Sequence, residues 1–102
     1  FIYNVNYRLL TYFIMKNLFI MIIKGVNAGR VFPLSKDETI IGRGMECDIR
    51  IPDTMVSRSH CRIKKSNDKF WIKDLHSTNK TFVNEKVISV EKKLQIGDII
   101  KI

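Results

Sequence analysis

Side chains suited to holding a phosphate gather in two short polar clusters of the sequence. The first is Ser57-Arg58-Ser59-His60, which Gly42-Arg43 precedes, and the second is Ser77-Thr78-Asn79-Lys80-Thr81. Hydroxyls that flank a guanidinium offer neutral and charged donors to the acceptor oxygens of a phosphate. An arginine placed by a glycine at a strand end projects a planar fork of donors with the same preference. The two clusters therefore predict a phosphate-reading surface.

The same clusters also contain the residue types of nucleophilic catalysis. His60 has serines and Cys61 beside it, and Asp74-Leu75-His76-Ser77 holds the types of a catalytic triad. Adjacent residues on a strand point to opposite faces, and triad members come from separate elements. No glycine elbow precedes a candidate nucleophile. We therefore expect a non-enzymatic protein. His60 should be buried and should hold the loop that contains Ser57 and Ser59, called the serine loop, through hydrogen bonds.

The cysteines point to neither a disulfide framework nor a metal centre. Cys47 and Cys61 are too few for the first, and with His60 and His76 they form no regular zinc spacing. We expect two reduced thiols in a cytoplasmic protein, with Cys61 buried in a strand. No metal or other cofactor is expected.

Length and charge limit the classes of protein that remain. A chain of 102 residues with 45% hydrophobic residues suits one domain with one core. The net charge is +8, and no acidic residue occurs in residues 1–35. A basic surface favours an anionic partner, either a phosphorylated protein or a nucleic acid. No helix-turn-helix, zinc finger or aromatic stacking platform supports the nucleic acid, which stays an alternative.

The apolar run from Leu9 to Ile23 allows several structural interpretations. It falls short of the roughly 20 residues that a membrane helix needs. A signal peptide cleaved near Val26-Asn27-Ala28 is an alternative, although a basic leader segment is nearly absent. We expect two strands, over residues 5–14 and 18–23, with a break at Lys16-Asn17. A helix over the same run is the alternative, because periodicity does not distinguish the two in short apolar stretches.

Downstream, short branched and aromatic runs alternate with turn residues every eight to twelve positions. This spacing is typical of an all-β sandwich. Strands are predicted over Arg30–Leu34, Glu38–Gly42, Ile49–Ile51, Cys61–Lys64, Phe70–Asp74, Phe82–Val83, Val87–Val90 and Ile99–Ile102.

In order and spacing, Gly42-Arg43 and the two clusters closely resemble the forkhead-associated (FHA) domain. The resemblance runs from about Leu18 to Ile102 and includes Cys47-Asp48-Ile49, Asp74-Leu75 and Gly97-Asp98. It implies a sandwich of about eleven short strands in two twisted, antiparallel or mixed sheets. Loops at one end of that sandwich bind phosphothreonine peptides.

The resemblance also implies roles for individual residues. Arg43 and Ser57 would hold the phosphate, with Arg58 as a second cation and with help from Thr78. Asn79 would hydrogen-bond the peptide backbone beside the phosphothreonine. Gly42 and His60 would support the site structurally. Met55 would influence selectivity by favouring an apolar residue three positions after the phosphothreonine.

Two positions depart from the family pattern. Lys80 stands where the family usually has glycine, and His76 stands where it often does. A glycine at such a turn suggests a positive φ, which lysine adopts at a cost of roughly 1 kcal/mol or more. Lys80 also adds a cation near the site, so we expect retained binding with altered selectivity.

The chain ends pose a further question. The family has a strand after the 97–102 segment, between the first and the penultimate strands. We expect residues 1–17 to be an apolar extension of an FHA domain at 18–102, and residues 5–14 to fold back on 18–25 and fill that place. A strand supplied by a longer parent protein is the alternative.

These observations favour a phosphothreonine-binding module that mediates signalling interactions between proteins. The expected partner is a protein phosphorylated on threonine by a Ser/Thr kinase. Binding to a nucleic acid or to a membrane is not expected. Two alternatives are a basic nucleic-acid-binding domain and an FHA scaffold that binds its partners without phosphate.

Overall fold

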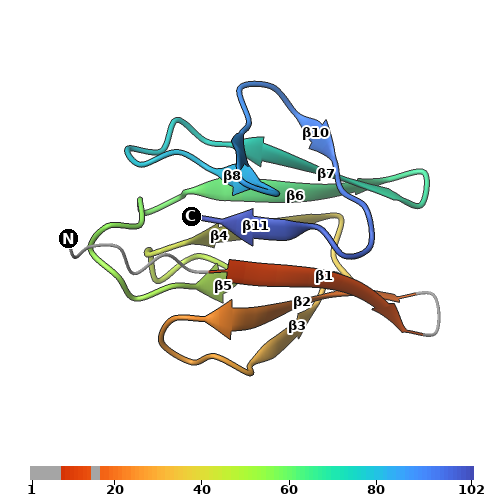
Figure 1. Cartoon of the computed structure of the whole chain (residues 1–102), viewed down its shortest axis with the longest axis horizontal. Coiled ribbons are helices and arrows are strands. Elements are labelled where there is room, and N and C mark those ends of the chain that lie inside the picture. The colour runs from red at the N-terminus through yellow and green to blue at the C-terminus, as the bar shows by residue number, and fades with distance from the viewer. Residues whose placement is uncertain (1–7, 15–16) are drawn as a thin grey trace.

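A computed structural model describes residues 8–14 and 17–102, and within them the chain is a sandwich of two β-sheets (Figure 1). One sheet has six strands in the order β3-β2-β1-β11-β8-β9, and the other has five in the order β10-β7-β6-β4-β5. The eleven strands are β1 (Arg8–Ile14), β2 (Asn17–Lys24), β3 (Val31–Pro33), β4 (Glu38–Gly42), β5 (Ile49–Arg50), β6 (Cys61–Ser66), β7 (Lys69–Asp74), β8 (Phe82–Val83), β9 (Lys86–Val87), β10 (Lys92–Lys93) and β11 (Ile99–Lys101). The predicted all-β sandwich is confirmed.

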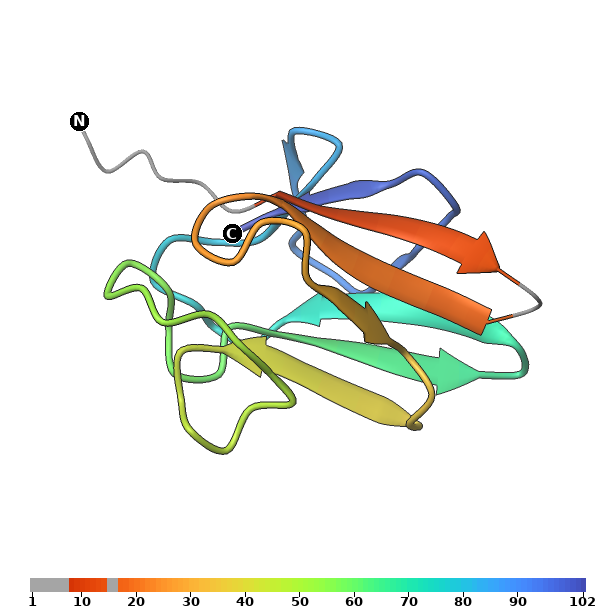
Figure 2. The same cartoon turned by 90° about the horizontal axis from the view of Figure 1, so that it is seen from below.

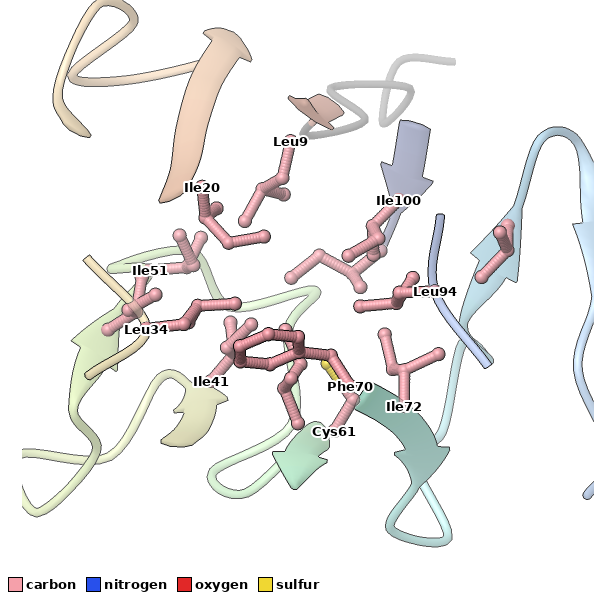
Figure 3. Close-up of a cluster of buried hydrophobic side chains, with 14 of the residues drawn as sticks. Leu9, Ile20, Leu34, Ile41, Ile51, Cys61, Phe70, Ile72, Leu94 and Ile100 are labelled. Atoms are coloured by element: carbon pink, nitrogen blue, oxygen red, sulfur yellow. The ribbon is translucent and has the colours of Figure 1, made fainter. Parts of the chain in front are cut away.

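The core lies between the two layers, which Figure 2 shows one above the other. In the close-up of Figure 3, Leu9, Ile20 and Ile100 come from the first sheet and meet side chains of the second, among them Ile41 and Ile72. Strand alternation explains the arrangement, since successive side chains of a strand point to opposite faces. In β7, for example, Phe70 and Ile72 are buried while the residue between them is only half-buried.

β1 occupies a central place in the six-stranded sheet. It pairs antiparallel with β2, from Arg8 opposite Lys24 to Ile14 opposite Asn17, and antiparallel with β11 on its other side. Leu9 is fully buried, and the buried Thr11 donates its hydroxyl to the Gln95 carbonyl at 2.8 Å. This part of the apolar run is therefore strand and not helix. Val5–Tyr7 lie outside the described residues, and the domain boundary at residue 17 stays a prediction.

The sequence prediction was wrong at two strands near the C-terminus. The strand expected over Val87–Val90 ends at Val87, because Ile88 turns inward and donates its amide to the Thr81 carbonyl at 3.0 Å. β10 was not predicted, because two consecutive lysines carry no apolar signal. It forms by pairing with β7, Lys93 lying opposite Trp71.

No helix long and apolar enough to cross a membrane occurs within residues 8–14 and 17–102.

Candidate functional site

Three loops meet at one end of the sandwich: residues 43–48, 51–60 and 75–81. Backbone contacts join the first two, because the amides of Arg43 and Gly44 donate to the carbonyls of Ser57 and Arg58 at 2.9 and 3.0 Å. The third loop joins through the Thr78 amide, which donates to Ser57 Oγ at 3.0 Å. Between the loops lies a hollow of about 450 Å³, lined by Arg43, Thr54, Met55, Val56, Ser57, Arg58, Thr78 and Asn79.

The hollow is lined by the five residues expected to bind a phosphopeptide and by Met55, which was expected to influence selectivity. Two further lining residues, Thr54 and Val56, were missed by sequence reasoning. The only sequence signal for them was their position just before the Ser57-Arg58-Ser59-His60 cluster. Gly42, His60 and Lys80 lie behind or beside the hollow and do not line it.

Gly42 allows the serine loop to approach the end of β4. A Cβ added at this position would lie 2.3 Å from the carbonyl oxygen of Arg58 and 2.9 Å from that of Ser57. Any side chain would push the loop away, because real atoms do not approach so closely. Glycine is therefore required here by contact and not by a positive φ.

The Arg43 side chain is half-buried and held by one of its nitrogens. Nε donates to the Val56 carbonyl at 3.0 Å, and the terminal nitrogens make no hydrogen bond with another described residue. The guanidinium fork is therefore fixed in direction with donors left for an anion, which is the geometry that suits a phosphate.

Arg58, in contrast, is exposed and paired with a carboxylate. Its terminal nitrogen lies 3.4 Å from Glu46 Oε1. The carboxylate of Glu46 folds over Gly44, where an added Cβ would lie 2.5 Å from Oε2. Glu46 was missed by sequence reasoning, and it competes for the cation expected to meet the phosphate.

His60 is fully buried beneath the serine loop. The Ser57 amide donates to Nδ1 at 3.1 Å, so Nδ1 is unprotonated and Nε2 carries the hydrogen that is donated to the Lys80 carbonyl at 2.8 Å. Burial lowers the pKa of His60, against the opposing effects of the Lys80 carbonyl and Asp74. A neutral imidazole thus joins the second and third loops, with both of its nitrogens engaged by backbone groups.

Asp74 organises the third loop from the end of β7. It accepts hydrogen bonds from the amide and hydroxyl of Ser77 and from the hydroxyl of Thr81, the last at 2.7 Å. Burial acts to raise the pKa of Asp74, but these hydrogen bonds outweigh it and lower the pKa. Ser77 is buried and its hydroxyl is turned toward Asp74, so it does not line the hollow.

Both positions where the family has glycine adopt the left-handed conformation here. Lys80 has φ of 70° and His76 has φ of 57°. The family's turn is therefore kept without its glycines, at the conformational cost that a side chain pays in this region. The Lys80 carbonyl takes part through its bond to His60, while its side chain is exposed.

The described residues hold no cluster of three or more histidine, cysteine or acidic side chains that suits a metal ion. Cys61 is fully buried, and this burial raises the pKa of its thiol to about 12. Cys47 donates its thiol to the Arg58 carbonyl at 2.9 Å, and burial raises its pKa also. Both thiols are therefore protonated and poorly nucleophilic at neutral pH.

The site belongs to a two-sheet sandwich whose end loops gather basic and hydroxyl side chains around one hollow. The FHA domain family model matches residues 39–102, which is more than half of the chain. The chain therefore belongs to the FHA domain family.

Individual relatives agree with this assignment. Human proliferation marker protein Ki-67 is 43% identical over 74 residues, which are 72% of this chain and 2% of Ki-67. A structure of Mycobacterium tuberculosis EmbR with a low-affinity phosphopeptide matches with a TM-score of 0.73 at 31% identity, over 96% of this chain and 22% of that one. An FHA structure from work on phosphothreonine-dependent interactions matches with a TM-score of 0.69 at 33% identity, over 93% of this chain and 84% of that one. The chain thus spans only a small part of Ki-67 and EmbR.

Proposed function

We propose that this FHA domain binds phosphothreonine in partner proteins and so mediates protein–protein interactions in signalling. The observation that carries the proposal is the hollow, where Arg43, Ser57, Arg58, Thr78 and Asn79 line one concave surface. Two similar structures support it: one comes from work on phosphothreonine-dependent FHA interactions, and the other is EmbR in complex with a phosphopeptide.

The phosphate is bound by two cations of different character. Arg43 supplies a fixed fork, anchored by its Nε bond to Val56. Arg58 is exposed and turns from Glu46 to the phosphate, so the ligand replaces one carboxylate with a dianion. The Ser57 hydroxyl donates to a phosphate oxygen while its oxygen keeps the Thr78 amide, and the Thr78 hydroxyl adds a further donor.

The peptide backbone and side chains are read around the phosphate. Asn79 bonds the peptide backbone beside the phosphothreonine; in the free protein its Nδ2 donates to the Met55 carbonyl at 2.7 Å. Met55 is 48% exposed at the rim and offers an apolar contact to the residue three positions later. Lys80, beyond the hollow, favours acidic residues in the peptide by its charge. Gly42 and His60 support the loops from behind.

The domain recognises its ligand without chemistry on it. His60 is neutral and engaged at both nitrogens, and among the described residues no imidazole or carboxylate hydrogen-bonds the Ser57 hydroxyl, whose partner is the Thr78 amide. A Ser/Thr kinase writes the mark and the partner protein carries it. We place this interaction in the cytoplasm, where the protonated, unpaired thiols of Cys47 and Cys61 persist.

The test is a fluorescence polarisation titration of labelled peptides that differ only in the phosphate. The phosphothreonine peptide is expected to bind, and the unphosphorylated peptide is expected to bind at least tenfold more weakly. A phosphoserine peptide should lose only about 1 kcal/mol or somewhat more, because it lacks one methyl group. Equal affinity for the phosphorylated and unphosphorylated peptides would contradict the proposal.

A further inference from the structure

The outward face of the five-stranded sheet carries the chain's single tryptophan. Trp71 lies in β7 between Phe70 and Ile72, which face the core, so its half-buried side chain points outward. In Figure 2 this sheet forms the lower layer, and the six-stranded sheet lies above it on the core side. Trp71 also lines a surface hollow of about 360 Å³ with Lys64, Ser66, Asn67, Lys69 and Glu91.

Basic side chains surround Trp71 on this face. By strand register, Trp71 lies opposite Lys64 of β6 on one side and opposite Lys93 of β10 on the other. Lys69 and Lys73 stand two positions away along β7 and share its face. We call these five residues the Trp71 face.

The four lysines of the Trp71 face have no bonded partner among the residues that the structure describes, because none of them forms an ion pair or a side-chain hydrogen bond there. Two acids lie near these lysines: Glu91 lines the same surface hollow as Trp71 and pairs with Arg62 at 3.6 Å, and strand register places Glu38 opposite Lys64. Lys73 lies opposite Arg62 in the register of β6 and β7, and like charges at opposed positions repel one another. An anionic partner that neutralises these charges would therefore stabilise the arrangement.

We propose that the Trp71 face binds an acidic polypeptide segment, independently of the hollow between the three loops. The lysines attract carboxylates by charge complementarity, and Trp71 packs against an apolar or aromatic side chain of the segment. A polypeptide fits better than a single-stranded nucleic acid, because the latter relies on successive bases stacked on aromatic side chains and the Trp71 face offers one ring.

Trp71 reports on this proposal directly, since it is the only tryptophan in the chain. The full chain is titrated with a glutamate-rich peptide that has one central phenylalanine, and Trp71 emission is recorded. A saturable change is expected, with affinity at least fivefold weaker at 500 mM than at 50 mM salt. The same peptide with lysine for glutamate should give no change.

Matched variants separate the Trp71 face from general charge. Lys64→Glu/Lys93→Glu should weaken binding of the glutamate peptide at least tenfold. Lys24→Glu/Lys86→Glu changes the net charge equally on the other sheet and should leave the affinity within twofold. Lys64→Gln/Lys93→Gln provides a milder change, expected to weaken binding at least threefold, if the reversal impairs folding.

Three outcomes would overturn the proposal: no saturable change in emission, equal losses in the two charge-reversal pairs, or tighter binding of an oligothymidine than of the glutamate peptide. Arg43→Ala separates this site from the proposed function. It should leave glutamate-peptide affinity unchanged even where phosphopeptide binding is lost.

Discussion

The molecule carries two cationic regions that differ in how their charges are held. In the loop hollow, Arg43 is fixed by its bond to Val56, and Ser57 is fixed by contacts with the Thr78 amide and His60. On the Trp71 face, the lysines extend from regular strands without partners among the described residues. Fixed, directional donors read the shape of a phosphate, whereas flexible ammonium groups read only charge. The comparison predicts a selective site and a salt-sensitive one.

The largest expected effect is the loss of phosphopeptide binding when Arg43 is removed. Arg43→Ala should cost about 2 to 5 kcal/mol, because the phosphate would lose a charged, pre-oriented donor. Lys64→Glu/Lys93→Glu is the comparison variant and should change phosphopeptide affinity less than threefold. Fluorescence polarisation measures both. If the lysine pair proved as damaging as Arg43→Ala, long-range charge and not local geometry would explain binding.

Both regions depend on the same sandwich, and β1 supplies part of its core. Leu9→Ala should lower the free energy of unfolding by about 2 to 4 kcal/mol, because Leu9 is fully buried opposite the second sheet. Urea denaturation measures this loss, and hydrogen exchange should show slow amides along β1. Fast exchange over residues 8–14 would contradict the pairing with β2 and β11.

Lowering the pH should destabilise the three loops around the hollow before it affects the Trp71 face. Because burial lowers the pKa of His60 from its ordinary 6.5, its contribution to stability is complete above that pH and falls as the pH drops through the lowered value. Protonation also places a hydrogen on Nδ1, where it meets the Ser57 amide. Urea denaturation of the free protein between pH 7 and 5 measures the decline. His76→Gln leaves His60 as the only histidine and should keep this pH dependence.

Lys80 provides a smaller and opposite effect, a gain in stability. Lys80→Gly should stabilise the fold by about 0.5 to 1 kcal/mol, because glycine adopts φ of 70° without a Cβ penalty. Lys80→Ala removes the same charge but keeps the strained conformation, and thermal denaturation should show no such gain. Equal gains in both variants would mean that charge repulsion, and not backbone conformation, governs this turn.

The smallest expected effect is a gain in phosphopeptide affinity when Glu46 is neutralised. Glu46→Gln should raise the affinity about two- to fivefold, since an exposed ion pair is worth little and only this competition is relieved. Glu38→Gln removes an equal charge opposite Lys64 and serves as the control in a polarisation titration. An affinity unchanged by Glu46→Gln would remove Glu46 from the account of the site.

The sequence predicted the strands best where local pattern and tertiary structure agree. The bounds of β4 and β8 match the prediction, because alternating burial and flanking turn residues mark both. β10 could not be predicted, since its two lysines become a strand only by pairing with β7. The inward turn at Ile88 likewise depends on a distant carbonyl, that of Thr81.

The candidate site was predictable in its types of residue but not in its contacts. Spacing placed Arg43, Ser57 and Asn79 on loops, and the sandwich gathers these loops around one hollow. The pairing of Glu46 with Arg58 and the inward turn of Ser77 toward Asp74 depend on side-chain orientations that no spacing encodes.

One measurement tests the difference between the two regions most directly: a chemical-shift titration of the nitrogen-15-labelled protein with a phosphothreonine peptide. The largest changes are expected at the amides of residues 43–48, 55–58 and 77–80 and at the side chain of Arg43, with the Trp71 indole unmoved. The unphosphorylated peptide should leave these loops unchanged. Changes centred on Trp71 and its lysines, with the three loops silent, would contradict the account.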